Sequence, residues 1–486
     1  MKLTKIIKYA IVTILFFTTF SACKKDLQPY NSKSDAQALR SLSDLQTATY
    51  GTYSLIKDHT FLRALWWMKM FPSDNVALSG NTSNPIYNSY TYIHIPTMSN
   101  IDQVWKGGYA AIYAANRIIE KINDGESAAL DQLKGENLYL RAWCHFNLVR
   151  LFGRPYTQNE GNNPGVPIKD NTLDELPSRN TVKEVYDFII ADLLKSATLM
   201  TMNKSASFAT KEAAYALLSR VYLYENDNTN AILYANKVFD SNRFKLLEGD
   251  AYKKYFTIVP ENNSETIFAV RNIVADDQKK QGIGTQFYND PVTKVTGYGE
   301  TYASQAFVDL LNKYPQDIRH SFVEPQRDAD GNMLTRGNVP KYYFNVYNWQ
   351  DGLANLSSPV VSRLAEMYLN RAEANAKLGN NQLAIDDVNI IRQRAGLSGS
   401  ALYTVDDLKG HNSVLDVVLE ERRLELAFEG QRYFDLYRNN RPLIRAYPGF
   451  HGDDHFNLTI LPTDNRIINL IPEREIIVNP KLTQNP

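Results

Sequence analysis

The sequence lacks the features that mark several common classes of protein. Only two of its 486 residues are cysteines, which excludes a disulfide framework. Basic and acidic residues number 53 each, and this zero net charge gives no indication of a nucleic-acid partner. No P-loop, G-x-S-x-G, H-E-x-x-H or complete dinucleotide fingerprint occurs. We therefore predict no catalytic residue and no cofactor, and we interpret Cys144 as a buried apolar residue rather than a nucleophile.

Two segments have the composition of a metal site without its spacing. The segment from His451 to His455 contains a glycine and follows Pro448, which argues against ligands on one helical face. The segment 328–332 resembles the start of a calcium loop, but Val339 stands where the loop needs glutamate. We predict no metal site: the first segment is expected to be a solvated loop, and the second a turn in a hairpin between residues 322 and 334.

The N-terminus has the pattern of a secretion signal. Three lysines precede an apolar run, Tyr9 to Phe20, that is too short to span a bilayer. The run ends in Phe20-Ser21-Ala22-Cys23, which resembles a bacterial lipobox. That resemblance implies a signal peptide over 1–22, acylation of Cys23 and a lipidated, polar tether over 23–38, with attachment to a membrane through the lipid. An ordinary signal peptide with an incidental cysteine is the alternative.

The rest of the chain, 39–486, reads as mostly helical. Apolar residues recur at helical spacing in six segments: 41–57, 104–122, 133–152, 181–200, 211–224 and 229–239. Two stretches, Ala213 to Val238 and Arg363 to Arg392, resemble tetratricopeptide units, with small residues where paired helices cross. Such units cannot bury their apolar faces alone, so we expect the two copies to stack.

A different pattern separates the two copies, over about 241–359. Residues 264–270 alternate between apolar and polar and predict a strand, and 341–349 is aromatic and strand-like. Gly282-Ile-Gly284 lacks the third glycine of a nucleotide-binding loop. The predicted fold class is therefore mostly α, a tetratricopeptide-like helical-repeat scaffold with an irregular, loop- and hairpin-rich insertion that carries the ligand surface.

The most informative stretch is Leu419 to Arg438. It begins as an amphipathic helix in which Glu421, Glu425 and Glu429 share one face, and Gly430 is its expected end. Paired carboxylates of this kind can serve a glycosidase. We instead predict an ion-pair network that fixes this helix to its neighbours, with the nearby arginines 422, 423 and 432 as partners.

This stretch, read as E-R-R-L-E-L-A-F-E-G-Q-R-Y-F-D-L-Y-R, resembles the C-terminal signature of the SusD/RagB family, surface nutrient-binding lipoproteins of Bacteroidetes. The last residues, from Ile471 to Pro486, resemble the usual ending of that family. The resemblance implies a lipid-anchored, surface-exposed protein of the outer membrane. It would capture oligosaccharides or peptides and pass them to a SusC-like TonB-dependent outer-membrane barrel, without breaking a bond.

Aromatic residues make up 12% of the chain, with 30 tyrosines, and exposed rings suit the flat faces of sugars. The segment 71–100 is rich in proline, asparagine and tyrosine and predicts a long loop, which is either part of a binding site or a cover for the core. Our candidate ligand-binding residues are Trp66, Trp67, Asp74, Asn75, Tyr92, Tyr288, Tyr298 and Trp349. The alternative functions are a tetratricopeptide adaptor that binds proteins, and a glycosidase that uses Glu421 and Glu425.

Overall fold

The computed structural model describes residues 39–79, 83–287, 297–336, 338–449, 451 and 458–486. The predicted signal peptide, Cys23 and the tether lie outside these residues. Chain contacts define a first unit, 1–45, whose described part is residues 39–45, and a second unit, 46–486. The elements described below belong to the second unit, except that the first helix begins at Leu42.

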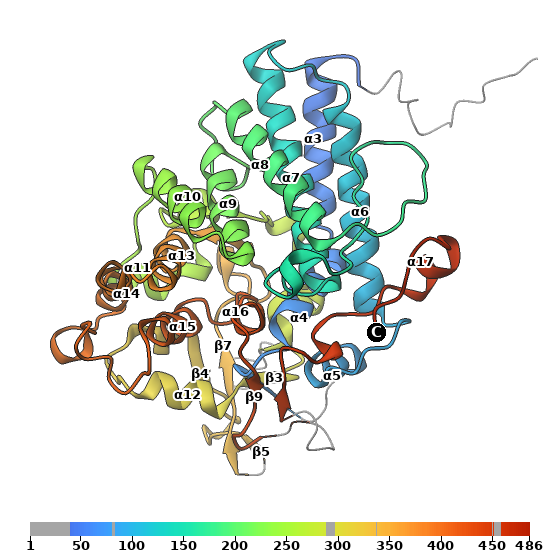
Figure 1. Ribbon diagram of the computed structural model, residues 1–486. Coiled ribbons are helices and arrows are strands. Elements are labelled where there is room, and N and C mark those ends of the chain that lie inside the picture. Colours follow the sequence, from blue (N-terminus) through green and yellow to red (C-terminus); the bar gives the residue numbers. More distant parts are fainter. Residues whose placement is uncertain (1–38, 80–82, 288–296, 337, 450, 452–457) are drawn as a thin grey trace, which may run out of the picture. The chain divides into compact units, whose positions relative to one another are not determined.

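The fold is mostly helical, as predicted, and Figure 1 shows the order of the elements. The fifteen α-helices of the described residues are α3 Leu42–Ile56, α4 His59–Met70, α5 Asn84–Thr91, α6 Ser99–Ile119, α7 Ala128–Phe152, α8 Val182–Leu199, α9 Lys211–Glu225, α10 Asn228–Asp240, α11 Gly249–Lys253, α12 Gln305–Asn312, α13 Leu364–Lys377, α14 Asn381–Arg394, α15 Val414–Glu425, α16 Arg432–Arg438 and α17 Glu473–Val478. All six helices predicted from periodicity are present, with ends that shift by a few residues.

The prediction of one long loop over 71–100 was wrong. This segment contains α5 and a short strand, and α6 already begins at its end. Pro85 occupies the first turn of α5, where proline is tolerated because the first N–H groups of a helix have no partner within the helix. The proline therefore marks the start of a helix rather than a loop.

The helices α6, α7 and α8 run side by side (Figure 1). Arg141 of α7 joins them, since its guanidinium donates to both carboxylate oxygens of Asp192 on α8, at 2.8 and 2.7 Å, and to Asn116 on α6 at 2.7 Å. The helix α8 begins with a capping box formed by Thr181 and Glu184. Cys144 of α7 is buried as predicted, and burial raises the pKa of its thiol.

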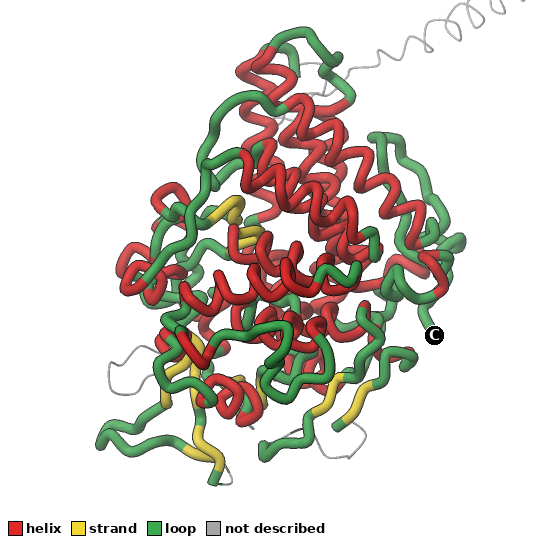
Figure 2. Tube along the Cα trace, turned by 60° about the vertical axis from the view of Figure 1, so that its left-hand side comes forward, coloured by secondary structure: helices red, strands yellow, loops and turns green. Residues whose placement is uncertain are grey.

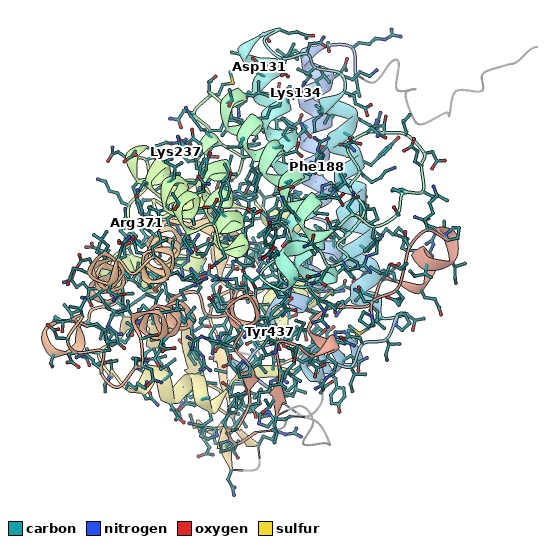
Figure 3. The ribbon with its side chains drawn as sticks, viewed as in Figure 1. Asp131, Lys134, Phe188, Lys237, Arg371 and Tyr437 are labelled. Atoms are coloured by element: carbon teal, nitrogen blue, oxygen red, sulfur yellow. The ribbon has the colours of Figure 1, made fainter. Side chains whose placement is uncertain are left out.

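The two tetratricopeptide-like copies form the helix pairs α9–α10 and α13–α14, and α10 packs against α13. A buried ion pair between Arg220 of α9 and Glu366 of α13, at 2.5 Å, ties one copy to the other. Arg371 of α13, labelled in Figure 3, bonds Asp387 of α14 and Asn236 of α10. The copies therefore stack through charged contacts as well as apolar ones.

The insertion contains short antiparallel strand pairs, drawn in yellow in Figure 2. The strand β2 (Thr266–Ala269) confirms the predicted strand and pairs with β8 (Val360–Arg363), which brings the two ends of the insertion together. The other pairs are β1 (Val76–Leu78) with β3 (Thr301–Ala303), β4 (Val323–Pro325) with β7 (Tyr342–Phe344), β5 (Thr335–Arg336) with β6 (Val339–Pro340), and β9 (Leu443–Ile444) with β10 (Thr459–Ile460).

The segment that resembled a calcium loop is a turn, as predicted. Arg327 and Met333 form a β-bridge across it. One carboxylate oxygen of Asp328 accepts the N–H groups of Asp330 and Asn332, at 2.9 and 2.8 Å. Asparagine and aspartate side chains commonly close turns in this way, so the acidic pattern has a structural cause.

Candidate functional site

The glutamates of α15 form an ion-pair network, as predicted, but with different arginines. Glu421 is buried and bonds Arg319 at 2.6 Å and Arg392 at 2.9 Å. Both partners come from segments far away in the sequence, Arg392 from α14 and Arg319 from the insertion. The nearby arginines predicted as partners pair elsewhere: Arg422 of α15 bonds Asp435, while Arg423 of α15 and Arg432 of α16 pair with Asp74.

Glu425 and Glu429 extend this network to the base of the insertion. Arg363, at the end of β8, lies 2.5 Å from Glu425 and 2.7 Å from Glu429, and Arg394 of α14 also bonds Glu425. Burial opposes the charge of Glu425, but the guanidinium groups of Arg394 and Arg363 outweigh it and lower the pKa of Glu425 to about 2. A carboxylate of such low pKa stays ionised at neutral pH, which does not suit a general acid.

The helix ends slightly earlier than predicted, at Glu425, and the chain then turns through Phe428 and Gly430, whose φ values are +65° and +76°. A Cβ on Gly430 would lie 2.6 Å from the Cβ of Lys69. Glycine is therefore needed both for the left-handed conformation and for the close approach to α4.

Asp74, predicted to contact ligand, is buried between two arginines of the signature stretch. Its carboxylate accepts two hydrogen bonds from Arg432, both of 2.8 Å, and lies 3.4 Å from Arg423. Arg423 also donates to the side-chain oxygen of Asn75 at 2.7 Å. Burial raises the pKa of Asp74, but Arg423 and Arg432 outweigh that effect and hold it below its usual value. The structure thus gives Asp74 and Asn75 the role of fixing the turn after α4.

Three of the predicted aromatic residues are also buried. Trp66 donates its indole N–H to the hydroxyl of Tyr347 at 3.0 Å, and Trp67 lies beneath the guanidinium of Arg63, 4.9 Å from ring centre to Cζ. Tyr92 donates its hydroxyl hydrogen to the carbonyl of Pro72 at 3.0 Å. In this conformation these side chains have partners within the protein rather than a face open to ligand.

Tyr298 and Trp349 are the candidates that remain accessible, with 51% and 36% of their surface exposed. Tyr288 lies outside the described residues. Neither accessible residue lines a pocket itself, but both are connected through hydrogen bonds to residues that line, or bond the lining of, a pocket of about 190 Å³. The pocket is lined by the end of α3, the start of α4, the segment 272–283 and residues 355–357.

Trp349 and Tyr298 are joined to this pocket by backbone hydrogen bonds. Gln350, directly after Trp349, donates its side-chain N–H to the carbonyl of Asn272 at 2.9 Å and its backbone N–H to the carbonyl of Leu356 at 3.2 Å. Asn272 and Leu356 both line the pocket. The N–H of Tyr298 donates at 2.6 Å to the carbonyl of Thr285, whose hydroxyl bonds the backbone of the pocket wall. The backbone of Tyr298 and the residue after Trp349 are thereby connected to residues that line the pocket.

The two glycines at 282 and 284, the first of which lines the pocket, allow close backbone contacts beside it. A Cβ at Gly282 would lie 2.6 Å from the carbonyl oxygen of Asn355, and one at Gly284 only 2.2 Å from that of Tyr347. The glycines therefore allow two backbone segments to lie directly against each other. The Gly-x-Gly pattern is the sequence signal for this wall, although by its spacing alone it resembles only an incomplete nucleotide-binding motif.

Several charged groups line the pocket. Lys57 and Asp276 form an ion pair of 2.8 Å. Asp58 is the N-cap of α4, where its carboxylate accepts the N–H groups of Thr60 and Phe61. Arg63, one turn further along α4, completes this set. Polar groups around a partly enclosed space beside exposed rings are typical of a ligand site.

The predicted absence of a metal site is not tested over the whole chain. Among the residues that the structure describes, no three His, Cys, Asp or Glu side chains gather in a way that would hold an ion. Of the segment 451–455 only His451 is described, and its ring bonds the hydroxyl of Tyr90 and the carbonyl of Tyr447. None of the helices within the described ranges is long and apolar enough to cross a bilayer.

Comparison with known proteins gave consistent matches along the chain. A model of the SusD family matches residues 293–486, and a model described as "Starch-binding associating with outer membrane" matches residues 26–223. SusD-like protein P38 of Formosa agariphila is 25% identical, covering 100% of this chain and 99% of that protein. A SusD-like protein of Bacteroides ovatus is 24% identical over 87% of this chain and 80% of its own length.

Solved structures agree with these sequence matches. A SusD superfamily protein from Bacteroides thetaiotaomicron superposes with a TM-score of 0.83 at 28% identity, covering 92% of this chain and 100% of the other. A SusD superfamily protein from Bacteroides vulgatus gives a TM-score of 0.80 at 29% identity, covering 92% and 99%. A protein described as "Putative sugar binding protein", also from Bacteroides vulgatus, gives 0.79 at 26% identity, covering 93% and 99%.

Proposed function

This chain belongs to the SusD family, and from that premise we propose that it binds oligosaccharide nutrients, or peptides, at the cell surface and delivers them to a SusC-like TonB-dependent barrel in the outer membrane. In this proposal the protein is anchored through a lipid on Cys23 and carries out no chemistry. The ligand is captured, the protein moves as a lid on the barrel, and the ligand is released inward.

The observation that carries the binding part is the polar pocket, to whose lining the segments that carry the exposed Trp349 and Tyr298 are hydrogen-bonded. Sugar rings present flat C–H faces that pack on aromatic rings, while amides and charged groups bond their hydroxyls. Asn272 and Asn355 supply such amides in the pocket lining. The family that matches the N-terminal part is described as starch-binding, and one structural neighbour as a putative sugar binding protein, which favours oligosaccharide over peptide.

Neither alternative function has comparable support. The glycosidase hypothesis needs Glu421 and Glu425 as an acid–base pair facing substrate, yet both are buried in ion pairs and neither lines the pocket beside Trp349. The adaptor hypothesis needs a groove on the repeat helices α9, α10, α13 or α14, whereas this pocket is lined by other segments.

The test is a binding screen with the full chain extracted in detergent. Polysaccharides and peptides are examined by affinity electrophoresis and calorimetry, and product formation is followed in the same samples. We expect binding to one polymer class without products. Trp349→Ala and Tyr298→Ala should each weaken that binding about five- to tenfold, since one aromatic contact contributes roughly 1 kcal/mol.

Tyr113→Ala is the matched control, because Tyr113 lies on α6 away from the pocket and is 48% exposed. Binding that is equally weakened by all three changes, or by none, would contradict this pocket as the site. Released products would support an enzyme instead. The delivery part is tested by co-purifying the chain with a co-expressed SusC-like barrel, and a barrel that never retains the chain would count against it.

A further inference from the structure

Arg63 differs from the other charged groups of the pocket because no carboxylate of the described residues neutralises it. It lies on α4, half-buried in the pocket lining. Within the described part of the chain its one hydrogen bond runs from Nη1 to the carbonyl oxygen of Gln281, at a long 3.4 Å. Its Nε is buried without a hydrogen-bond partner among these residues. The guanidinium is thus partly desolvated, and most of its five donors have no good acceptor there.

The electrostatic surroundings agree with this geometry. Burial lowers the pKa of Arg63, and the largest opposing contribution comes from the hydroxyl of Tyr298 rather than from an acid. Arg220 and Arg319, by contrast, are buried and each bonds a carboxylate, at 2.5 and 2.6 Å. An arginine that is desolvated without a counter-charge is costly in a folded protein.

The remaining charges of the pocket are already compensated. Lys57 and Asp276 neutralise each other through two hydrogen bonds of 2.9 and 2.8 Å. The charge of Asp58 is satisfied by the first N–H groups of α4, where a negative group also suits the helix dipole. Among the described lining residues, Arg63 is therefore the cation that no carboxylate neutralises. Its guanidinium lies over the ring of Trp67, and this contact leaves the N–H donors at its edge for a ligand.

We propose that the ligand of this pocket is an acidic oligosaccharide, whose carboxylate or sulfate group binds the guanidinium of Arg63. The proposal rests on the function proposed above and specifies its ligand class. A guanidinium pairs with carboxylate or sulfate oxygens through two parallel N–H donors, and such charge-assisted bonds are stronger than those to neutral hydroxyls. Tyr298 and Trp349 would pack on the sugar rings, which favours an acidic glycan over an acidic peptide.

The experiment compares polymers that share a backbone and differ in charge. The full chain in detergent is run through gels that contain polygalacturonate or its methyl ester, alginate or its propylene glycol ester, and dextran, carboxymethyl dextran or dextran sulfate. Calorimetry follows for each polymer that retards it. We expect the acidic member of at least one set to bind about tenfold to a hundredfold more tightly than its neutral counterpart, as charged hydrogen bonds predict. The comparison of carboxymethyl dextran with dextran sulfate shows whether the protein prefers a carboxylate or a sulfate group.

Variants link that preference to one side chain. Arg63→Gln should remove the preference for the acidic polymer, whereas Arg63→Lys, which keeps the charge but not the two parallel donors, should reduce it. Lys280→Gln is the control for general charge, since Lys280 is exposed in the segment beside the pocket. Each variant is first checked for an unchanged melting temperature, and Arg63→Lys provides the result if Arg63→Gln does not fold.

The outcomes separate the two proposals. Three outcomes would overturn the acidic-ligand inference alone. Neutral polymers could bind as tightly as acidic ones, Arg63→Gln could keep the preference for the acidic polymer, or Lys280→Gln could lose as much of that preference as Arg63→Gln. Binding confined to polyglutamate would overturn it in favour of peptides. Failure to bind any polymer or peptide, here and in the wider screen, would count against the proposed binding function itself.

Discussion

Replacing Glu425 with glutamine should destabilise the whole chain, because this carboxylate holds three elements together. Arg363 from β8 and Arg394 from α14 bond it directly, and Arg319 of the insertion lies 3.5 Å away. The hydroxyl of Tyr252 donates to its second oxygen at 3.0 Å. Glutamine keeps the shape of the side chain but removes the charge, so the arginines are left buried with less compensation.

The size of the effect follows from the pKa. Burial raises the pKa of Glu425, yet Arg394, Arg363 and Arg319 outweigh it and lower the value from 4.5 to about 2. This lowering of the pKa corresponds to about 3 kcal/mol, at roughly 1.4 kcal/mol for each pH unit. Breaking a buried ion pair by removing one partner costs a similar amount, roughly 3–5 kcal/mol. We therefore expect Glu425→Gln to lower the free energy of unfolding at neutral pH by about 3 kcal/mol.

The pH dependence provides a second measure of the same interaction. Because the folded-state pKa is lowered, the contribution of Glu425 is fully present above pH 4.5 and is lost as the pH falls toward about 2. Urea unfolding, followed by tryptophan fluorescence and circular dichroism, would measure both chains across this range. Their stabilities should differ most at neutral pH and converge in acid.

Glu420→Gln is the matched control on the same helix. Glu420 is partly exposed and pairs with Lys313, whose side chain is 52% exposed, so its loss should cost less than about 1 kcal/mol. The reasoning fails if Glu425→Gln stays within about 1 kcal/mol of the unaltered chain at neutral pH, since a buried pair is expected to cost several times more. It also fails if both variants lose the same stability.

Three further outcomes test other parts of the structure. Gly284→Ala should weaken polymer binding in the calorimetric assay, because the new Cβ would lie 2.2 Å from the carbonyl oxygen of Tyr347 and displace the pocket wall; unchanged binding would contradict this. Trp66→Ala should lower the free energy of unfolding in urea by roughly 3–5 kcal/mol. Trp349→Ala should leave the melting temperature unchanged. Equal losses of stability in the two variants would show that the burial of these side chains does not decide stability. Burial lowers the pKa of His145 from 6.5 to about 3, so stability should fall as the pH drops below 6.5, and a His145→Gln variant with the same slope would refute that cause.

Much of the fold was predictable because its signals are local. The periodicity of Lys211–Glu225 and the capping box at Thr181 depend on residues within one or two helical turns of each other. The alternation around β2 likewise reports a single strand. The helix α5 is one of those not predicted, and it shows that proline is ambiguous in a local pattern, since the same residue starts helices and interrupts them.

Exposure of individual aromatic side chains was much less predictable. Trp66 and Trp349 have the same side chain in similarly aromatic contexts, yet the first is 1% exposed and the second 36%. Which of them faces solvent depends on packing by segments far away in the sequence, such as Tyr347 against Trp66. Composition indicated that some aromatic rings suit a ligand. Packing leaves two of the described aromatic candidates, Tyr298 and Trp349, exposed to solvent.

By itself, the sequence determined that the chain is helical, that it contains two repeat-like units around an irregular insertion, and that the glutamates of α15 are structural. These properties follow from short-range spacing and from the cost of leaving like charges unpaired. The tertiary structure alone decided which arginines neutralise Glu421 and Glu425, and that Asp74 pairs with Arg432. It also placed Arg63 in the lining of a pocket, with no carboxylate bonded to it among the described residues. Long-range pairing depends on how distant segments meet, and no local pattern encodes that meeting.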